Sequence, residues 1–165
     1  MDNSQIDNLL KASLKNTGTL YLGSYAADQV PNSSPFYPCC LIANTDPCDL
    51  PGMHWVAVYY PNPHELEFFD SFGNHPSAYN YIVRDTVVHY NPYTIQSLDS
   101  VACGHYCIYF LYERSHNKSL ISIVKYLTTL KRKSDQYVTS FTHKLFSFIS
   151  KKSGMHESHC WWKRK

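Results

Sequence analysis

Two short segments that alternate between apolar and polar residues, joined by Pro61-Asn62-Pro63, most constrain the fold of this chain. They are residues 54–60 (HWVAVYY) and residues 65–72 (ELEFFDSF). Alternation with a period of two is typical of β-strands, and a short connection rich in Pro and Asn is typical of a tight turn. The sequence therefore predicts a β-hairpin, and with it a sheet around which the rest of the chain must pack.

The pairing of this hairpin has a chemical consequence. If Pro61–Pro63 form a three-residue loop, the apolar residues of the two strands face each other, and His54 faces Asp70 on the same side of the sheet. The other predicted pairs are Tyr60–His64, Val58–Leu66 and Val56–Phe68. Residues directly opposite in such a pair have their Cβ atoms ~5 Å apart. A carboxylate at that distance can accept the second N–H of an imidazole and stabilise its charged form.

The remaining segments predict further strands and several helices in one domain over residues 1–165. Residues 39–44 form an apolar run suited to a buried strand, whereas residues 18–38 are rich in loop-forming residues. Short strands are expected at 20–22, 83–89 and 93–96, and helices at 4–15, 103–114, 119–131 and 134–151.

The composition is that of a globular protein, with 44% hydrophobic and 17% charged residues. No apolar run approaches the ~20 residues of a membrane span, and residues 1–16 do not have the pattern of a secretory signal. We therefore expect a chain that is not secreted and works in a reducing compartment. The six cysteines lack the spacing of a zinc site, so free thiols and no metal site are expected.

Charge is distributed unevenly along the chain. Residues 1–112 contain 3 Lys/Arg and 10 Asp/Glu, which gives −7, whereas residues 113–165 contain 12 and 3, which gives +9. The two parts sum to the net charge of +2. A basic third of a small protein could bind a polyanion such as nucleic acid, and an ordinary solvated helical surface explains the same charges equally well.

Cys103 lies at the predicted start of a helix, where the helix dipole and free amides stabilise a thiolate. Gly104 leaves room for a substrate beside the sulfur, and Gln96 could donate to an oxyanion together with the Cys103 amide. Taken singly, each of these residues fits a structural role at least as well. Taken with His54 and Asp70, they form a complete set for acyl transfer from an amide.

Three blocks carry a resemblance to a known family. The segments Gly52–Trp55 (GMHW), Phe68–Gly73 (FFDSFG) and Ala102–Gly104 (ACG), with Gln96 between the last two, resemble the adenovirus protease (adenain) family. These viral cysteine endopeptidases share a clan with the SUMO and ubiquitin-like proteases. Weaker similarity extends to residues 21–25, 145–148 and Cys160, and so over nearly the whole chain.

The resemblance implies an α+β fold with a central mixed β-sheet flanked by helices and a papain-like catalytic arrangement in permuted order. In that order His54 is the base, Asp70 the third member, Gln96 the oxyanion donor and Cys103 the nucleophile. Gly104 and Trp55 would lie on the substrate side, although core packing explains Trp55 equally well. The implied activity is cleavage of viral precursor proteins at glycine-containing sites during virion maturation.

The resemblance also implies partners and a location. The chemistry requires no cofactor, but members of the family are stimulated by DNA and by a short viral peptide attached through a disulfide. Residues 85–93, where the attachment cysteine would fall, contain no Cys, so covalent attachment by that route is not expected. Non-specific DNA binding would involve Lys131, Arg132, Lys133, Lys163, Arg164 and Lys165. We expect a monomer that works at the virus assembly site or in the host nucleus, and in the virion.

Alternatives remain open at this point. Adenovirus enzymes typically carry Glu where this chain has Asp70, whereas SUMO proteases carry Asp, so a deubiquitinase-like or SUMO-protease-like hydrolase is a second interpretation. An acyltransferase of the same clan uses a similar His/acid/Cys set. An inactive binding module with a basic surface is the last alternative, and it is disfavoured because every catalytic position is filled.

Overall fold

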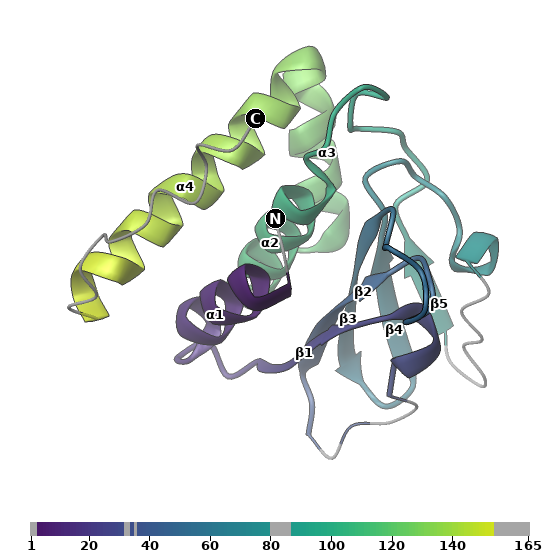
Figure 1. Ribbon diagram of the computed structural model, residues 1–165, viewed down its shortest axis with the longest axis horizontal. Coiled ribbons are helices and arrows are strands. Elements are labelled where there is room, and N and C mark those ends of the chain that lie inside the picture. Colours follow the sequence, from purple (N-terminus) through teal and green to yellow (C-terminus); the bar gives the residue numbers. More distant parts are fainter. Residues whose placement is uncertain (1–2, 32–33, 35, 80–86, 154–165) are drawn as a thin grey trace.

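The computed structural model describes residues 3–31, 34, 36–79 and 87–153. In this part of the chain one five-stranded sheet is packed against a group of α-helices (Figure 1). The strands are β1 (Leu20–Tyr25), β2 (Cys39–Asn44), β3 (Trp55–Asn62), β4 (Glu65–Phe69) and β5 (Val87–Tyr90). The α-helices are α1 (Asn3–Leu14), α2 (Cys103–Ser115), α3 (Leu120–Leu130) and α4 (Ser134–Ser153), and the short 3₁₀ turns are η1 (Ala27–Gln29), η2 (Pro76–Tyr79) and η3 (Lys131–Lys133).

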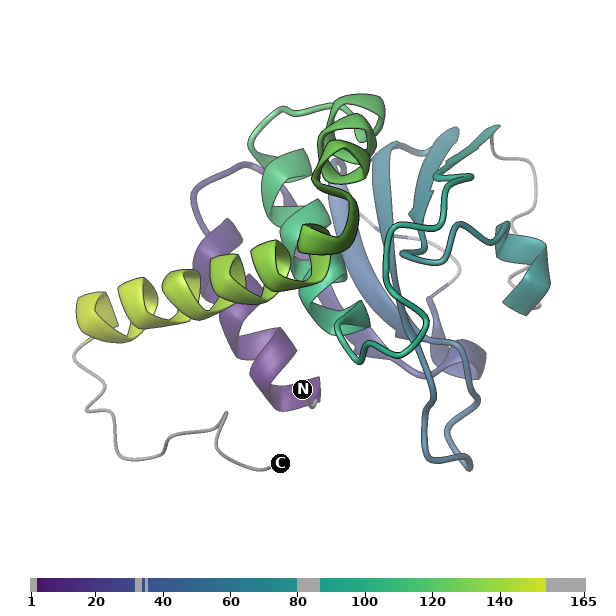
Figure 2. The same cartoon turned by 90° about the horizontal axis from the view of Figure 1, so that it is seen from above.

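The sheet is mixed, with the strand order β1-β2-β3-β4-β5. Its centre is antiparallel, because β2 pairs with β3 and β3 with β4 in opposite directions. Both outer strands are parallel to their neighbours, β1 to β2 and β5 to β4. The α+β class and the central mixed sheet with helices packed on it are therefore confirmed, and Figures 1 and 2 show that α1 to α4 lie on one side of the sheet.

The predicted register of the hairpin is wrong by two residues. Val58 pairs with Phe68, and Ala57 with Phe69, whereas the sequence analysis had placed Val56 opposite Phe68. The strands continue to the Asn62–Glu65 pair, beyond a register shift after Tyr59, so the turn is tighter than a Pro61–Pro63 loop. A shift of two keeps every side chain on its predicted face, because side chains alternate with a period of two.

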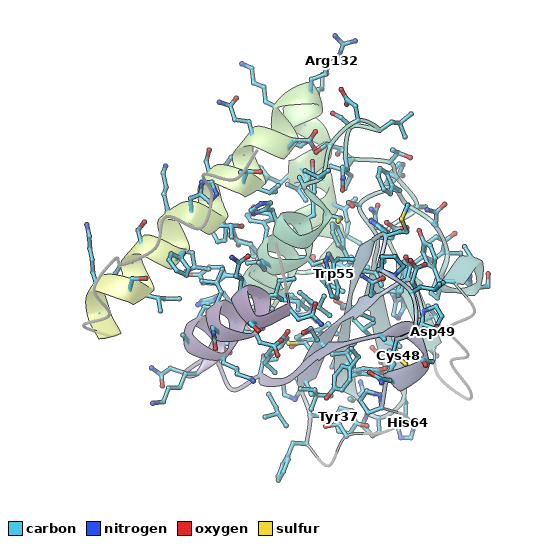
Figure 3. The ribbon with its side chains drawn as sticks, in the orientation of Figure 1. Tyr37, Cys48, Asp49, Trp55, His64 and Arg132 are labelled. Atoms are coloured by element: carbon cyan, nitrogen blue, oxygen red, sulfur yellow. The ribbon has the colours of Figure 1, made fainter. Side chains whose placement is uncertain are left out.

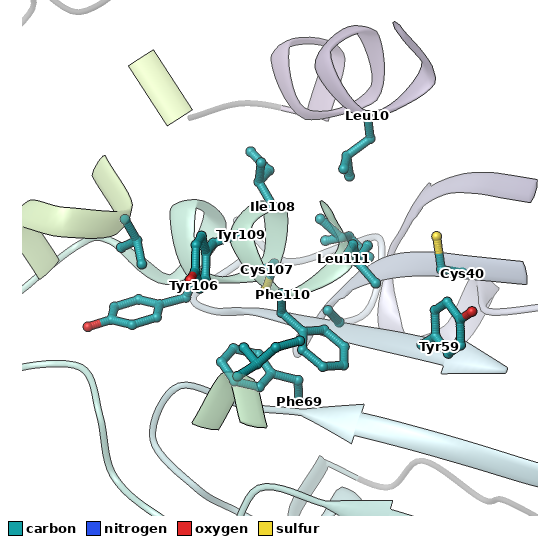
Figure 4. Close-up of a cluster of buried hydrophobic side chains, with 14 of the residues drawn as sticks. Leu10, Cys40, Tyr59, Phe69, Tyr106, Cys107, Ile108, Tyr109, Phe110 and Leu111 are labelled. Atoms are coloured by element: carbon teal, nitrogen blue, oxygen red, sulfur yellow. The ribbon is translucent and has the colours of Figure 1, made fainter. Parts of the chain in front are cut away.

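Alternation along β3 and β4 divides the apolar side chains between two faces. The face toward the helices carries the larger cluster, in which Phe69 stacks on Phe110 of α2 at 4.7 Å between ring centroids (Figure 4). The other face carries a smaller cluster that includes Val58 and Phe68. Helix α2 is buried on nearly all sides, between the sheet and the other helices (Figure 2), so its first residue has a fixed place beside the sheet.

The remaining segments depart from the predictions mostly at their ends. The strand predicted at 20–22 continues to Tyr25, and residues 93–96 form no strand in the described structure. Residues 87–90 form β5, whereas the first half of the strand predicted at 83–89 lies outside the described residues. Among the helices of the described residues, none is long and apolar enough to cross a membrane.

Candidate active site

His54 and Asp70 are in contact although they are not directly opposite in the sheet. His54 immediately precedes β3 and Asp70 immediately follows β4, and the imidazole Nε2 lies 2.7 Å from Oδ1 of the carboxylate. Continued past the strand ends, the observed register places Phe72 opposite His54, and the two rings have centroids 4.9 Å apart. His54 therefore reaches Asp70 along the diagonal, a distance that a long side chain can span.

The carboxylate of Asp70 is fully buried and held by several donors. Its Oδ1 also accepts the backbone N–H of Phe72 at 2.9 Å. Its Oδ2 accepts the Tyr79 hydroxyl at 2.6 Å and the Asn74 side-chain amide at 2.9 Å. Burial opposes ionisation, but the hydrogen bonds from His54, Tyr79 and Phe72 outweigh it and lower the pKa of Asp70. The carboxylate is therefore ionised and fixed in orientation toward the imidazole.

Cys103 is the first residue of α2, as the sequence predicts. The helix is tied to the start of β3 one turn later, where the Cys107 thiol donates to the Trp55 carbonyl at 3.3 Å. This contact brings the amino end of α2 next to the residue that follows His54. The imidazole and the Cys103 sulfur interact electrostatically there, and the backbone amides of Trp55 and Gly104 also favour the charged form of the sulfur.

The two reactive groups shift each other's ionisation. Burial opposes the charged form of each group, but the attraction between imidazolium and thiolate prevails, together with Asp70 on the histidine side. The pKa of His54 is raised to about 9, and the pKa of Cys103 is lowered from its usual range. The remaining ring nitrogen, Nδ1, is buried and has no close hydrogen-bond partner among the described residues, so it is the nitrogen that can exchange a proton with the sulfur. The site therefore favours a thiolate–imidazolium pair.

Gln96 is buried and fixed at both ends of its amide. Its Oε1 accepts the Ser71 hydroxyl at 2.7 Å, and its Nε2 donates to the Ser100 carbonyl at 2.7 Å. The backbone of the same segment is fastened to the turn after Asp70, because the N–H groups of Ile95 and Gln96 both reach the Ser71 carbonyl. One of the two N–H groups of Nε2 donates to the Ser100 carbonyl. The other can donate to an oxyanion.

Gly73 allows the two loops to pack closely. Its φ of +78° lies in the left-handed region, and a Cβ there would come within 2.6 Å of the Tyr93 backbone. The Asn91 amide bridges the same loops, since it donates to the carbonyls of Asp70 and Tyr93 at 2.8 and 2.9 Å. The carboxylate and the Gln96 amide are thus held in one rigid unit.

Trp55 and Gly104 both lie next to Cys103, and the Trp55 indole is half-buried against the main core cluster. Lys131, Arg132 and Lys133 lie elsewhere, in the exposed η3 turn between α3 and α4, and Figure 3 shows Arg132 pointing outward at an end of the molecule remote from Trp55. Lys163, Arg164 and Lys165 lie outside the described residues. Over the described ranges, no group of three or more His, Cys, Asp or Glu side chains could hold a metal ion.

The residues that support Asp70, Gln96 and His54 were not predicted from the sequence. Tyr79 and Asn74 hold Asp70, Ser71 holds Gln96, and the Phe72 ring packs at a tilt against His54. Phe72 and Ser71 belong to the FFDSFG block, which was noted for its resemblance alone. Nothing periodic marks Tyr79 or Asn74, since both lie in irregular chain after the hairpin.

Comparisons with known proteins agree with this fold. The protease of Bovine adenovirus C serotype 10 is 29% identical over 91 residues, an alignment that covers 44% of this chain and 46% of that protein. Among solved structures, an ASFV protease matches with a TM-score of 0.57 at 19% identity, over 75% of this chain and 61% of its own. No family model matches the chain.

These relatives are longer than the matched region, so the chain spans about half of the adenovirus protease and about three fifths of the ASFV protease. The match to the ASFV protease establishes the α+β fold. The local sequence match is to an adenovirus protease, the family that the GMHW, FFDSFG and ACG blocks resemble. The chain is thus similar to an adenovirus protease in sequence and to a viral protease in fold.

Proposed function

We propose that this chain is a cysteine endopeptidase of the adenain type, with Cys103 as nucleophile, His54 as base and acid, and Asp70 orienting the histidine. The observation that carries the proposal is the 2.7 Å contact between the buried Asp70 carboxylate and the His54 imidazole, together with the Cys103 sulfur at the start of α2, whose pKa the same imidazole lowers. A purely structural histidine–aspartate pair would have no reason to adjoin a thiol whose pKa is lowered.

The geometry supports a standard acyl transfer. The Cys103 thiolate attacks the scissile carbonyl carbon, and a C–S bond forms as the carbonyl electrons move to oxygen. The Cys103 amide and the Gln96 side chain stabilise the oxyanion. His54 then gives its Nδ1 proton to the leaving nitrogen as the C–N bond breaks, and the amine departs. Finally His54 removes a proton from water, which attacks the thioester and returns the sulfur as thiolate.

The resemblance implies the substrate class, and the similarity to two viral proteases supports a viral peptidase. We propose viral precursor polypeptides cut at glycine-containing sites, during virion maturation and at the site of virus assembly. This chain has Asp70 where adenovirus enzymes typically have Glu and SUMO proteases have Asp. Ubiquitin-like proteins are therefore the competing substrate class. The chain would act as a monomer without a cofactor, and DNA or a viral peptide would modulate it.

The test is turnover of a panel of glycine-containing peptides and a ubiquitin-like C-terminal reporter by the wild-type chain, Cys103→Ala and Cys39→Ala. Cys39→Ala is the matched thiol control, because Cys39 pairs with Tyr60 at the end of β2 opposite to Asn44 and Trp55. We expect cleavage by the wild type and by Cys39→Ala and none by Cys103→Ala. Equal activity of the Cys103→Ala and wild-type chains would contradict the proposal. Preferential cleavage of the ubiquitin-like reporter would instead indicate ubiquitin-like proteins as the substrates.

A second proposal concerns the basic surface. We propose that Lys131, Arg132 and Lys133, with Lys163, Arg164 and Lys165, bind DNA without sequence preference. The exposure of the first three at the η3 turn supports this, since phosphate contacts need accessible cations.

A further inference from the structure

A polar groove of about 450 Å³ is lined by Trp55, the residue that follows His54. It lies between the end of β1 and the loop that joins β2 to β3, and its lining includes Ser24, Gln29, Asn44, Asp46, Leu50 and Trp55. Gly52 also lines it with a φ of +83°, and a Cβ at that position would lie 2.7 Å from the Asn44 side-chain nitrogen. A larger residue at 52 would therefore push into the groove wall.

Trp55 links this groove to the chemistry. Its backbone amide helps to lower the pKa of Cys103, its carbonyl accepts the Cys107 thiol, and the residue lines the groove. A polypeptide whose scissile carbonyl lies at Cys103 therefore has one flank next to Trp55, where the groove begins. The polar lining suits an extended chain whose main-chain groups need hydrogen-bond partners.

The groove is acidic, and no described residue in its lining has a positively charged side chain. Asp46 lines it, and none of its lining residues is Lys, Arg or His. Asp28 lies directly behind the wall, because its carboxylate accepts both the backbone N–H and the thiol of Cys48, a lining residue. Asp49 is the next residue along, and Figure 3 shows it with Cys48 on the same side of Trp55. Residues 16–83 contain no Lys or Arg at all, so the three carboxylates meet no cation from the neighbouring sequence.

We propose that this groove binds the flank of the substrate that carries a Lys or Arg side chain, within a few residues of the scissile bond. This inference rests on the proposed function and adds a substrate class to it: polypeptides that combine glycine at the cleavage site with a nearby cation. Asp46 is the specificity-determining residue, because it is the acidic side chain that lines the groove itself. Opposite charges a few ångströms apart at a protein surface favour binding substantially over like charges.

The experiment uses one cleavable glycine-containing peptide in which each flanking position in turn is Lys, norleucine or Glu. At the favoured position, we expect the kcat/KM of the Lys peptide to exceed that of the Glu peptide by about tenfold or more. Asp46→Asn should reduce this ratio to a few-fold and Asp46→Lys should invert it. Both variants keep the backbone bonds of residue 46 to Ala27 and Asn44, so the loop is retained.

The matched control is Glu65→Gln, which removes a negative charge from the turn end of the hairpin and should leave the ratio unchanged. A binding measurement tests the groove separately from the protease activity. Labelled peptides are titrated against Cys103→Ala and followed by fluorescence anisotropy. Tighter binding of Lys peptides without any turnover by the wild type would support cation binding by the groove and contradict the proposed protease function. Turnover with equal kcat/KM for Lys, norleucine and Glu, or a ratio unmoved by Asp46→Lys, would overturn the groove alone.

Discussion

The Tyr79 hydroxyl donates a 2.6 Å hydrogen bond to Oδ2 of Asp70, whereas His54 contacts the other carboxylate oxygen. The phenol therefore fixes the rotation of the carboxylate through the oxygen that His54 does not contact, and its ring lies beside the imidazole, with centroids 6.2 Å apart. Tyr79 is thus a positioning residue that acts through Asp70 and His54.

The first prediction is that Tyr79→Phe lowers kcat about tenfold while KM stays nearly unchanged. A hydrogen bond to a charged group contributes about 1.5–3 kcal/mol, and its loss frees the carboxylate to rotate. Steady-state kinetics give the split between kcat and KM, and thermal unfolding shows whether the fold is intact. Tyr93→Phe, at an exposed tyrosine nearby, is the control. Equal kcat values for wild type and Tyr79→Phe would show that Asp70 needs no such support.

The sequence was sufficient for the parts of this site that depend on periodicity. Alternation in residues 54–60 and 65–72 predicted the hairpin and the faces of His54 and Asp70, and both predictions survived a register that was wrong by two residues. The error came from the turn, since Pro and Asn favour several loop lengths and packing decides among them. A shift of one residue would have placed the two side chains on opposite faces.

The supporting residues could not be predicted in the same way. Tyr79 reaches Asp70 from a 3₁₀ turn nine residues along, and Gln96 meets Ser71 across 25 residues. Such contacts depend on the path of irregular chain, which carries no periodic signal. The buried strand at 39–44 was placed correctly because a continuous apolar run has few other solutions.

The second prediction concerns thiol reactivity. Cys103 should be alkylated by iodoacetamide near neutral pH faster than Cys48, although Cys48 is exposed and Cys103 is partly buried. The His54 imidazole lowers the pKa of Cys103, whereas the hydrogen bond to Asp28 raises the pKa of Cys48. Peptide mapping by mass spectrometry measures both rates in one sample. His54→Gln should remove the advantage of Cys103, and a faster reaction at Cys48 in the wild type would refute the ion pair.

The third prediction is a bell-shaped pH profile of kcat/KM. Turnover needs Cys103 deprotonated and His54 protonated. Activity should therefore fall at acid pH as the thiolate with its lowered pKa is protonated, and fall again as pH rises through about 9, where His54 loses its proton. Burial alone would lower the pKa of His54, and Asp70 and Cys103 reverse that effect. Asp70→Asn should consequently move the alkaline limb to lower pH, and an unmoved limb would mean that Asp70 does not set the charge of the imidazole.

The fourth prediction tests the basic surface. DNA affinity should fall steeply with salt, because each phosphate contact releases counterions. Replacing Lys131, Arg132 and Lys133 together by Gln should weaken binding and reduce the slope of log K against log salt by up to about 3. Lys11→Gln is the control, since that lysine lies on α1 next to Asp7. Affinity that is the same at low and high salt would contradict DNA binding through these cations.

The fifth prediction separates oxyanion stabilisation from thiolate formation. The Gln96 amide is held by Ser71 and Ser100 and has one N–H left for a developing negative charge, which exists only during the reaction. Gln96→Ala should therefore lower kcat by about 10²–10³. The rate of Cys103 alkylation should stay near that of the wild type, because the His54 contact that lowers its pKa is retained.

Ser71→Ala supplies the matched comparison for Gln96→Ala. It leaves the Nε2 donor in place but removes the hydroxyl that fixes the other end of the amide, so its kcat should fall less than that of Gln96→Ala. Stopped-flow alkylation and peptide turnover on the same preparations measure both quantities. If Gln96→Ala slowed alkylation as much as turnover, Gln96 would be shaping the nucleophile itself, and the oxyanion would have to rely on backbone amides such as that of Cys103.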